Sequence, residues 1–435
     1  MILKEIARRI FQQTLASMDI PASMERKLDR QGTRIHCEGA TVNLAEFDRI
    51  VTVACGKAAE PMARGLLSVL APDFPTGGIL SAPVRLQREM PGFEAFAAGH
   101  PVPNEASLAA GAAALHVLSE CDEKSLVFLL LSGGGSALME QPLEPGIYLE
   151  DIQALNRLLV TCGAPIEQVN AVRKHLSAVK GGRLAAAAPR SMKITLGVTD
   201  VPAGRESALA SGPTLPDPTT VDDAYRVVAE YRLLERLPPS IRAVFQARAL
   251  QETPKPGDSA FARNHFQILL GMPDLFHAAH HASEAAGFLT ICDNTTDDWP
   301  LERAADVLLQ LLADWKRENP ARPVCVIADG EVSSPVTGNG VGGRNSAFVL
   351  DCVPRIAGKP ICVLSAGTDG ADGNSPAAGA VADGTSFQRA RAAGHDPADF
   401  FRASDAYTFF KSLGDAVETG PTGNNLRDLR ILLHT

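Results

Sequence analysis

The chain has 435 residues, too many for one compact core of usual size, so its length favours two domains. Its residues are 45% hydrophobic and 21% charged, which is typical of a globular protein and excludes a largely disordered chain. The formal net charge of -9 gives no bulk attraction for nucleic acid or for an anionic membrane, so any bound anion must be held by a local cluster.

The N-terminal segment, residues 1–18, carries charged residues inside a helical apolar pattern and lacks the apolar core and cleavage site of a signal peptide. No apolar run approaches the roughly 18 residues that a membrane-spanning helix needs. We therefore expect a cytoplasmic protein. The cysteines are scattered without a Cys-x-x-Cys pair, so neither a disulfide framework nor a zinc site is expected.

Apolar, β-branched runs alternate with helical periods along the chain, an order that predicts parallel α/β sheets. The expected strands are residues 50–54, 126–131, 194–198, 324–328 and 361–364. The expected helices include residues 58–70, 104–118, 166–178 and 304–315. Pro254, Pro256 and Gly257 mark residues 249–259 as a surface linker, and we place the domain boundary there.

The first expected strand leads into Gly56 and Lys57 at the start of a helix. Ligands of open α/β sheets bind beyond the carboxyl ends of strands. A cation at a helix N-terminus opposes the helix dipole unless an anion lies beside it. Lys57 is therefore either an anion-binding residue or a lysine that is solvated in a loop.

The most apolar strand is followed by a glycine loop, which consists of Ser132, Gly133, Gly134, Gly135 and Ser136. Successive glycines let backbone N–H groups converge on an anion, and the two serines add hydroxyl donors. The loop lacks the Gly-Lys-Ser/Thr ending of a Walker A motif. We interpret it as a phosphate-binding loop in preference to a tight strand-to-helix turn.

Two other strands end in acidic residues. Asp200 follows the strand at 194–198, where a carboxylate binds a metal, acts as a base or forms an Asx turn. Asp369 and Asp372 lie among glycines after the last expected strand. Their spacing does not fit an EF-hand, but oxygen ligands of this kind favour Mg²⁺ over the alternative of solvated turn residues.

A glycine-rich segment precedes Arg344. Gly338, Gly340 and Gly343 form a G-x-G-x-x-G pattern, yet they do not follow a strand directly, and no acidic residue lies about 20 residues beyond them. This does not favour a dinucleotide site. An arginine at the start of a helix instead suits a guanidinium that binds a phosphate or carboxylate through two hydrogen bonds.

The histidines carry no metal-binding pattern. His277, His280 and His281 lie on one expected helix without the glutamate of a zincin motif, so we interpret them as surface or partly buried residues. His100, within Gly-His-Pro-Val-Pro, is interpreted as a residue that shapes a loop.

Taken together, these segments resemble the glycerate 2-kinase family over nearly the whole chain. The N-terminal motifs are Gly-Lys-Ala-Ala at 56–59, Gly-His-Pro-Val-Pro at 99–103, Ser-Gly-Gly-Gly-Ser at 132–136, Asn-Ala-Val-Arg-Lys-His-Leu-Ser at 170–177 and Lys-Gly-Gly-Arg-Leu at 180–184. Those that extend into the so-called MOFRL domain are Ala-Ser-Gly-Pro-Thr at 210–214, Gly-Gly-Arg-Asn at 342–345, Gly-Thr-Asp-Gly at 367–370 and Thr-Gly-Pro-Thr-Gly-Asn-Asn at 419–425. Their order along the chain matches the family as well.

The resemblance implies two α/β/α, Rossmann-like domains, at residues 1–248 and 258–435, with an active-site cleft between them. It implies Mg²⁺ with ATP as the phosphate donor, and D-glycerate phosphorylated at its 2-hydroxyl to give 2-phosphoglycerate. The expected partners are these small molecules, with neither nucleic acid nor a membrane. The chain is expected to be a monomer or a homodimer.

Carried over by position, the resemblance assigns catalysis to Lys57, Arg344 and Asp200, and phosphate binding to Ser132, Gly133, Gly134, Gly135 and Ser136. It assigns substrate binding to Lys57, Arg173, Arg344 and Asn345, and metal binding to Asp200 and Asp369. Lys57 and Arg344 come from different expected domains and are expected to meet one anionic group when the cleft closes. Because both lie at loop-to-helix junctions, alanine at either position is expected to cost less than roughly 1 kcal/mol of stability.

Two other functions stay open from the sequence. One is a hydroxypyruvate reductase, a name that members of this family have carried, but the sequence lacks a properly placed dinucleotide fingerprint. The other is a non-catalytic sensor of a sugar acid or a nucleotide. Charged loops in both expected domains favour catalysis, because a simple binder of glycerate needs neither the glycine loop nor the acidic loop.

Overall fold

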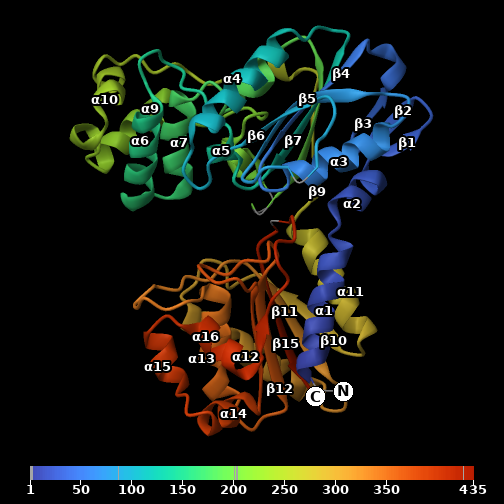
Figure 1. Cartoon of the computed structure of the whole chain (residues 1–435), viewed down its shortest axis with the longest axis vertical. Coiled ribbons are helices and arrows are strands. Elements are labelled where there is room, and N and C mark those ends of the chain that lie inside the picture. The colour runs from blue at the N-terminus through green and yellow to red at the C-terminus, as the bar shows by residue number, and fades with distance from the viewer. Residues whose placement is uncertain (1–2, 87, 200, 202–203, 425) are drawn as a thin grey trace. The chain divides into compact units, whose positions relative to one another are not determined.

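The computed structural model describes residues 3–86, 88–199, 201, 204–424 and 426–435. The chain divides into two compact units, coloured along the chain in Figure 1. We call residues Ile20–Leu270 the central unit, and Met1–Asp19 with Gly271–Thr435 the terminal unit. No helix in the described part of the chain is long and apolar enough to span a membrane.

The central unit is built on a six-stranded sheet in the order β6-β5-β4-β7-β8-β9, in which all neighbours are parallel. A small antiparallel sheet, β1-β2-β3, accompanies it. The strands are β1 (Asp29–Gln31), β2 (Arg34–Cys37), β3 (Ala40–Asn43), β4 (Arg49–Cys55), β5 (Thr76–Ala82), β6 (Phe93–Ala97), β7 (Ser125–Ser132), β8 (Met192–Val198) and β9 (Asn264–Leu270). The helices are α2 (Ile20–Lys27), α3 (Ala59–Leu70), α4 (Glu105–Ser119), α5 (Gly135–Leu138), α6 (Leu149–Thr161), α7 (Ile166–Leu176), α8 (Arg183–Ala186), α9 (Val221–Glu230) and α10 (Pro239–Gln246), with the 3₁₀ turns η1 (Leu44–Glu46), η2 (Glu206–Ser211), η3 (Leu234–Arg236) and η4 (Ser259–Phe261).

Burial on both faces explains the parallel sheet of the central unit. Every residue of β7 is buried, as expected for a strand that lies at the centre of a parallel sheet and is covered on both sides. α3 packs on β4, β5 and β7, while α4 packs on β5 and β6. A second core forms among α6, α7, α9 and α10 and includes Leu155, Val172 and Val227. The predicted α/β architecture is confirmed for this unit.

The terminal unit contains a mixed six-stranded sheet in the order β10-β11-β15-β12-β13-β14. Its strands are β10 (Leu289–Asp293), β11 (Val324–Asp329), β12 (Ile361–Gly367), β13 (Gly379–Asp383), β14 (Ala416–Val417) and β15 (Asp428–His434). Its helices are α1 (Leu3–Ser17), α11 (Met272–Ala285), α12 (Leu301–Glu318), α13 (Arg344–Arg355), α14 (Ser386–Ala392), α15 (Pro397–Arg402) and α16 (Ala406–Leu413). β15 runs antiparallel to β11 and β12, so the expectation of parallel sheets is wrong for this unit.

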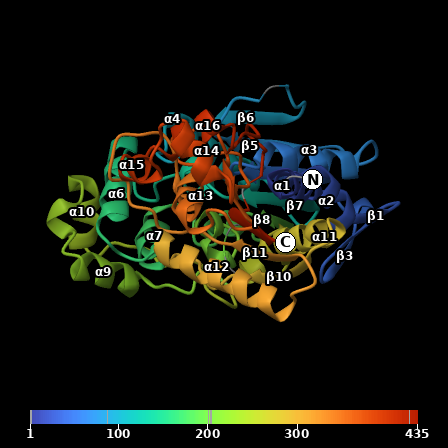
Figure 2. The ribbon, with the colours of Figure 1, turned by 90° about the horizontal axis from the view of Figure 1, so that it is seen from below.

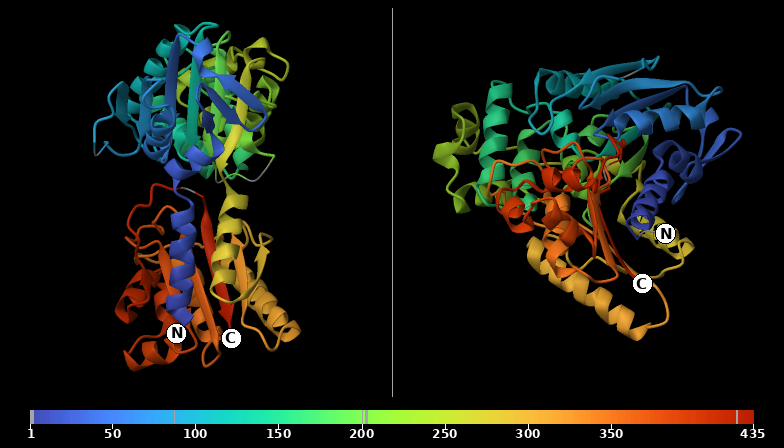
Figure 3. Two further views of the ribbon diagram at one scale, coloured as in Figure 1. Left: turned by 90° about the vertical axis from the view of Figure 1, so that its right-hand side faces the viewer. Right: turned by 60° about the horizontal axis from the view of Figure 1, so that its bottom comes forward.

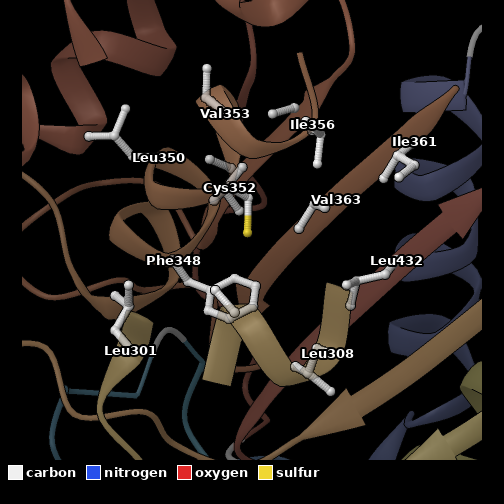
Figure 4. Close-up of a cluster of buried hydrophobic side chains, with 14 of the residues drawn as sticks. Leu301, Leu308, Phe348, Leu350, Cys352, Val353, Ile356, Ile361, Val363 and Leu432 are labelled. Atoms are coloured by element: carbon white, nitrogen blue, oxygen red, sulfur yellow. The ribbon is translucent and has the colours of Figure 1, made fainter. Parts of the chain in front are cut away.

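Alternate residues of the terminal sheet face two helical layers. Figure 4 shows Phe348 of α13 close to Leu308 of α12, with Val363 of β12 on the same side of the sheet. α12 and α13 also pack on each other, and both are visible in Figure 2. On the other face α1 and α11 run side by side, as the left panel of Figure 3 shows. This sheet is therefore also the middle of three layers.

The units differ from the predicted domain ranges at both ends. α1 packs on α11 and β12, so the first residues belong to the terminal unit. Residues 249–259, the predicted linker, lie inside the central unit, where the Thr253 hydroxyl donates to Asp217 Oδ2 at 3.1 Å. The central unit extends beyond this segment because β9 completes its sheet against β8. Proline and glycine mark an irregular segment, but they do not show whether another strand follows it.

Candidate active site

The lysine loop, which consists of Gly56 and Lys57 after β4, lies beside the glycine loop of the central unit because β4 and β7 pair in parallel, with Cys55 opposite Leu131. The N–H of Lys57 donates to the carbonyl oxygen of Gly133 at 2.9 Å. The N–H of Ala58 donates to Ser132 Oγ, also at 2.9 Å. Two motifs that are far apart in the sequence therefore form one surface at the carboxyl edge of this sheet.

Glycine is required where these loops approach each other. Gly56 has a φ of +131°, and a Cβ atom there would lie 2.1 Å from Ser132 Oγ. Gly134 has a φ of +85°, and its Cβ would lie 3.0 Å from His100 Cδ2 and 3.4 Å from Lys57 Cγ. These positions need a residue without a side chain.

His100 is a residue of this surface whose place the sequence did not indicate. Its ring lies beside Gly134, on the glycine loop. Burial, and to a smaller extent the charge of Lys57, lowers the pKa of His100. The imidazole is therefore mostly neutral at pH 7 and can accept a hydrogen bond. The Gly-His-Pro-Val-Pro motif was the signal that could have placed it here.

The two serines of the glycine loop have different surroundings. Ser132 is fully buried and accepts the Ala58 N–H, so its hydroxyl joins the two loops. Ser136 is half-buried, and its Oγ lies 2.8 Å from Ser211 Oγ. Within the described residues, the N–H groups of Gly134, Gly135 and Ser136 donate no hydrogen bond outside helices and strands, which leaves them available to an anion. Phosphate binding by residues 132–136 stays a prediction.

Arg173 lies on α7, one helical turn from Asn170. Asn170 accepts a hydrogen bond from Ser211 at 3.3 Å, so α7 is connected through Ser211 to Ser136. The Nε of Arg173 donates to Asn156 Oδ1 at 2.9 Å, and its Nη atoms have no hydrogen-bond partner among the described residues. A half-buried guanidinium with unused donors suits a carboxylate or phosphate ligand. Substrate binding by Arg173 also stays a prediction.

Buried ion pairs hold the loops that follow the glycine loop. Glu140 is 5% exposed, accepts the Ser177 hydroxyl at 2.5 Å and pairs with Lys180. Lys174 pairs with Asp217 at 3.0 Å, and both side chains are buried. Sequence reasoning missed Glu140, whose proximity to the glycine loop in the sequence was the available signal. The two motif lysines therefore fix the scaffold around the site.

The acidic loops of the terminal unit meet at one edge of its sheet. β11 and β12 end at this edge, and β15, antiparallel to both, begins there. Asp329 ends β11, Asp369 follows β12, and Asp428 begins β15. The predicted position of the acidic loops beyond strand ends is confirmed by this topology.

Arg344, at the first position of α13, is held by two carboxylates. Its Nε donates to Asp428 Oδ2 and its Nη1 to Glu331 Oε2, each at 2.6 Å. Burial lowers the pKa of Arg344, but Asp428 and Glu331 outweigh this effect and raise it. Its side chain is 36% exposed and its Nη2 has no partner among the described residues. Because of these two ion pairs, we expect alanine at this position to cost more stability than the roughly 1 kcal/mol limit expected from the sequence.

The neighbours of Arg344 have structural partners. Asp372 is 2% exposed and accepts the N–H groups of Asn345 at 2.9 Å and Ser346 at 2.8 Å, which caps the start of α13. The Asn345 side chain is 1% exposed and accepts the Ser365 hydroxyl at 2.6 Å. The substrate-binding role of Asn345 stays a prediction.

Asp329 lies fully buried at the end of β11, and neither of its carboxylate oxygens has a hydrogen-bond partner among the described residues. Arg430 bonds only the backbone next to it, donating to the carbonyl oxygens of Asp329 at 3.1 Å and Gly330 at 3.0 Å. Burial raises the pKa of Asp329 to about 6, although Arg427 opposes this. A buried carboxylate without partners is costly in its charged form.

The charges at this edge of the sheet decide which cation it can bind. Its carboxylates, which outnumber its guanidiniums, are Asp297, Asp329, Glu331, Asp369 and Asp428, against Arg344, Arg427 and Arg430. No group of three or more His, Cys, Asp or Glu side chains in the described chain is placed to hold a metal ion. Mg²⁺ usually binds through one or two carboxylates, several waters and substrate phosphates. The surplus negative charge therefore fits a Mg²⁺ that arrives with a nucleotide.

Of the two predicted metal ligands, the structure describes only Asp369. Asp369 is half-buried in the loop after β12, and its Oδ1 accepts the Ala371 N–H at 3.0 Å. The adjacent loop packs closely, since a Cβ at Gly370 would lie 2.0 Å from the Gly420 carbonyl oxygen. Asp200 lies outside the described residues. Metal binding by both aspartates, and catalysis by Asp200, stay predictions.

Comparisons with known proteins identify the family. A domain of unknown function, DUF4147, matches residues 6–246, and the MOFRL family matches residues 324–428. A protein of Thermotoga maritima named D-glycerate 2-kinase is 35% identical, over 90% of this chain and 92% of the relative. The chain belongs to the glycerate 2-kinase family. This confirms the resemblance that the sequence motifs indicated.

Other members of the family are similar over their full length. The glycerate 2-kinase of Pyrococcus horikoshii is 30% identical over 100% of this chain and 98% of its own. A protein of Agrobacterium vitis with the provisional name hydroxypyruvate reductase is 35% identical over 99% of this chain and 94% of its own length. The crystal structure of the Thermotoga maritima glycerate kinase superposes with a TM-score of 0.86 at 32% identity, covering 100% of this chain and 99% of that chain. The fold of the family therefore extends over the whole of this chain.

Proposed function

We propose that this chain transfers the terminal phosphoryl group of ATP to the 2-hydroxyl of D-glycerate and produces 2-phosphoglycerate. The observation that carries the proposal is the full-length similarity to the Thermotoga maritima D-glycerate 2-kinase, at 35% identity. Phosphoryl transfer needs the two reactants in line and the charge of the transferred group neutralised, with little covalent work for the protein. The residues at the two sheet edges are suited to these tasks.

The central unit supports the binding of phosphate groups. The N–H groups of Gly134, Gly135 and Ser136 would donate to phosphate oxygens, and the half-buried Lys57 would add a positive charge beside them. The Lys57 and Gly133 backbones are bonded at 2.9 Å, which fixes the lysine loop against the glycine loop. A site that is fixed before the reaction stabilises developing charge without reorganising.

Arg344 and Arg173 are the proposed partners of the remaining anionic groups. Arg344 keeps its Nη2 unused among the described residues, while Glu331 and Asp428 fix the orientation of its guanidinium. Arg173 is fixed in the same way through its Nε by Asn156. Held guanidiniums of this kind would orient the carboxylate of glycerate or a phosphate.

Mg²⁺, when bound with ATP, would neutralise phosphate charge, and Asp369 is the described carboxylate that we propose as its protein ligand. Asp200 is proposed to orient the attacking hydroxyl. The cytoplasmic location and the choice between monomer and homodimer stay predictions.

A reductase is the second candidate, and the provisional name of the Agrobacterium vitis relative favours it. The position of the glycine-rich segment argues against it. β11 ends at Asp329, and the G-x-G-x-x-G glycines, ending at Gly343, lie in a long loop before α13. A dinucleotide fingerprint instead lies on the turn that joins a strand directly to a helix.

The test is to incubate the protein with ATP, Mg²⁺ and D-glycerate and to identify the product isomer by ³¹P and ¹³C NMR. We expect glycerate-dependent release of ADP and 2-phosphoglycerate, lost in EDTA and restored by Mg²⁺. Formation of 3-phosphoglycerate would contradict the proposed regiochemistry. Loss of NADH or NADPH with hydroxypyruvate, in proportion to the enzyme, would favour the reductase, and binding without either turnover would favour a sensor.

A further inference from the structure

Two histidines lie one turn apart on α11, and neither belongs to the candidate active site. The Nε2 atoms of His277 and His281 are 3.2 Å apart. Their ring centroids are 4.5 Å apart and the ring planes meet at 87°. When no ligand is bound, one Nε2 donates an N–H···N hydrogen bond to the other, so the two ring nitrogens face each other across 3.2 Å.

The helix fixes this arrangement. Leu275, Ala279 and Ala282 are buried on the inner side of α11, whereas His277 and His281 are exposed. The start of α11 is fixed because the Gly271 N–H donates to Asp274 Oδ2 at 2.9 Å. Residues i and i+4 of a helix lie on one face, so a rigid, well-packed helix presents the two imidazoles together.

The distance between the nitrogens matches a chelate. Metal–imidazole bonds of about 2.0–2.1 Å to one ion would enclose an angle of about 100° across 3.2 Å, between the octahedral and tetrahedral values. We propose that His277 and His281 form a surface binding site for a divalent transition-metal ion, which both would ligate through Nε2. The proton of that hydrogen bond would then move to Nδ1 of the donor ring, which leaves both rings neutral.

The ligand chemistry selects the metal. Imidazole nitrogens suit Cu²⁺, Ni²⁺ and Zn²⁺ and are poor ligands for Mg²⁺, so this site is chemically separate from the proposed nucleotide-bound metal. Since the described residues contain no group of three such side chains placed to hold an ion, water would complete the coordination. Asp274 and Glu284, three residues before His277 and after His281, add negative charge on the same helical stripe. Among these metals Cu²⁺ is expected to bind most tightly.

The competing candidate for a metal site is the neighbouring group of His280, Cys292 and Glu284. His280 lies 3.8 Å through Nδ1 from Cys292 Sγ and 3.4 Å through Nε2 from Glu284 Oε1. These partners lie on opposite sides of the imidazole ring, so they do not converge on one ion. Burial also raises the pKa of the Cys292 thiol to about 11, which keeps it protonated and a weak ligand.

The experiment uses the untagged, full-length protein at pH 7.5, titrated with Cu²⁺ and Zn²⁺ by isothermal calorimetry in excess Mg²⁺. The variants are His277→Ala, His281→Ala and His280→Ala, with His116→Ala on α4 as a matched surface control. Alanine is a good helix former, so α11 is expected to keep its structure, which circular dichroism checks. Electron paramagnetic resonance of the Cu²⁺ complex reports the number of coordinating nitrogens.

We expect one equivalent of Cu²⁺ to bind with two-nitrogen coupling. His277→Ala and His281→Ala should each weaken binding about tenfold or more, while His280→Ala and His116→Ala bind as the parent does. Unchanged Cu²⁺ affinity in His277→Ala or His281→Ala would overturn the proposal, as would its loss in His280→Ala alone.

Discussion

Lys57 is the residue for which a structural and a catalytic role separate most cleanly. Its backbone N–H holds the glycine loop, and alanine at this position keeps that bond. Only the side chain carries the charge that we propose for phosphate neutralisation.

Lys57→Ala is therefore expected to lower kcat by about a hundredfold or more, as loss of a preorganised electrostatic group does. Unfolding free energy should change by less than about 1 kcal/mol. Steady-state kinetics and chemical denaturation measure the two effects, with Lys124→Ala as a control on the exposed surface of the same unit. If kcat stays within a few fold of the parent, Lys57 is a solvated loop residue.

Arg344 combines both roles, because Glu331 and Asp428 depend on it. Arg344→Ala should lower kcat about a hundredfold and also destabilise the chain by about 1–3 kcal/mol, because Asp428 is left buried without its partner. Solvent around the partly exposed guanidinium keeps the cost at this modest level.

The triple variant Arg344→Ala, Glu331→Gln, Asp428→Asn separates the two effects. Removing the orphaned charges should restore most of the thermal stability while activity stays low. Recovery of activity together with stability would show that Arg344 only holds the fold.

Asp329 predicts a pH dependence of stability whose sign follows from burial. Its folded pKa of about 6 lies above the ordinary 3.8, so between about pH 4 and 6 the folded chain binds more protons than the unfolded chain. Stability from this residue is therefore present below pH 4 and lost as the pH rises to 6.

Asp329→Asn removes the charge. The free energy of unfolding of this variant should therefore rise relative to that of the parent between pH 4 and 6, and the difference above pH 6 has an upper limit of about 3 kcal/mol. Thermal melts at pH 4, 5, 6 and 7.5 measure the difference between the two proteins. Asp73→Asn, at an exposed position, serves as the control. Parallel curves for Asp329→Asn and the parent would show that the pKa of Asp329 is the same in the folded and the unfolded chain, because a partner offsets its burial.

At the scale of elements, the lysine loop and the glycine loop depend on a glycine at their crossing point. Gly56→Ala places a methyl group 2.1 Å from Ser132 Oγ, so the loop after β4 must shift away from β7. We expect a loss of activity of about a hundredfold, since a displacement of this size moves Lys57 out of place.

Gly146→Ala is the matched control for this prediction. Gly146 also has a left-handed φ, of +91°, but a Cβ there would meet nothing within 4 Å. Gly146→Ala should lower the free energy of unfolding by about 1 kcal/mol through backbone strain and should leave kcat unchanged. Equal losses of activity in the two variants would show that strain, and not the crossing of the loops, is responsible.

The sequence patterns predicted the elements in which local composition and burial agree. The expected strand at 126–131 is β7, whose residues are buried on both faces, and the helices expected at 58–70 and 166–178 are α3 and α7. β13, Gly-Ala-Val-Ala-Asp, and β15, which begins with Asp428, were missed. The small residues of β13 carry little strand signal, and Asp428 and Arg430 interrupt the apolar pattern of β15; pairing with β12 stabilises both strands.

The candidate site was predicted in the same uneven way. Glycines and charged residues after strands located Lys57, the glycine loop and Arg344, because topology places such positions at one sheet edge. The ion-pair partners of the site residues were not predicted. Glu331 and Asp428 around Arg344, and Glu140 with Lys180, are set by pairings of distant segments, which one sequence does not reveal.

At the scale of the molecule, the terminal unit is assembled from both ends of the chain. Phe11 of α1 is fully buried, and Lys4 of the same helix pairs with Asp415 at 3.0 Å. Phe11→Ala should destabilise this unit by about 3–5 kcal/mol, as truncation of a buried aromatic does.

Hydrogen exchange would locate this effect. In Phe11→Ala, the protection of backbone amides from exchange should fall in α11, β12 and β15, while the amides of β4 and β7 in the central unit should keep their protection. Val160→Ala, at a position 71% exposed, should change neither. Equal loss in both units would mean that they unfold as one.

The position of β15 sets an order on biosynthesis. β15 lies between β11 and β12 in the sheet, yet it is the last of the described strands along the chain, while α1 is the first of the described helices. The central unit, continuous in sequence, can fold during translation. At about 5–20 residues per second, the apolar face of α1 waits on the order of 20–80 s for its final partner strand. Nascent chains of this protein therefore expose that face for most of their synthesis, and chaperones that bind amphipathic helices have that long to engage it.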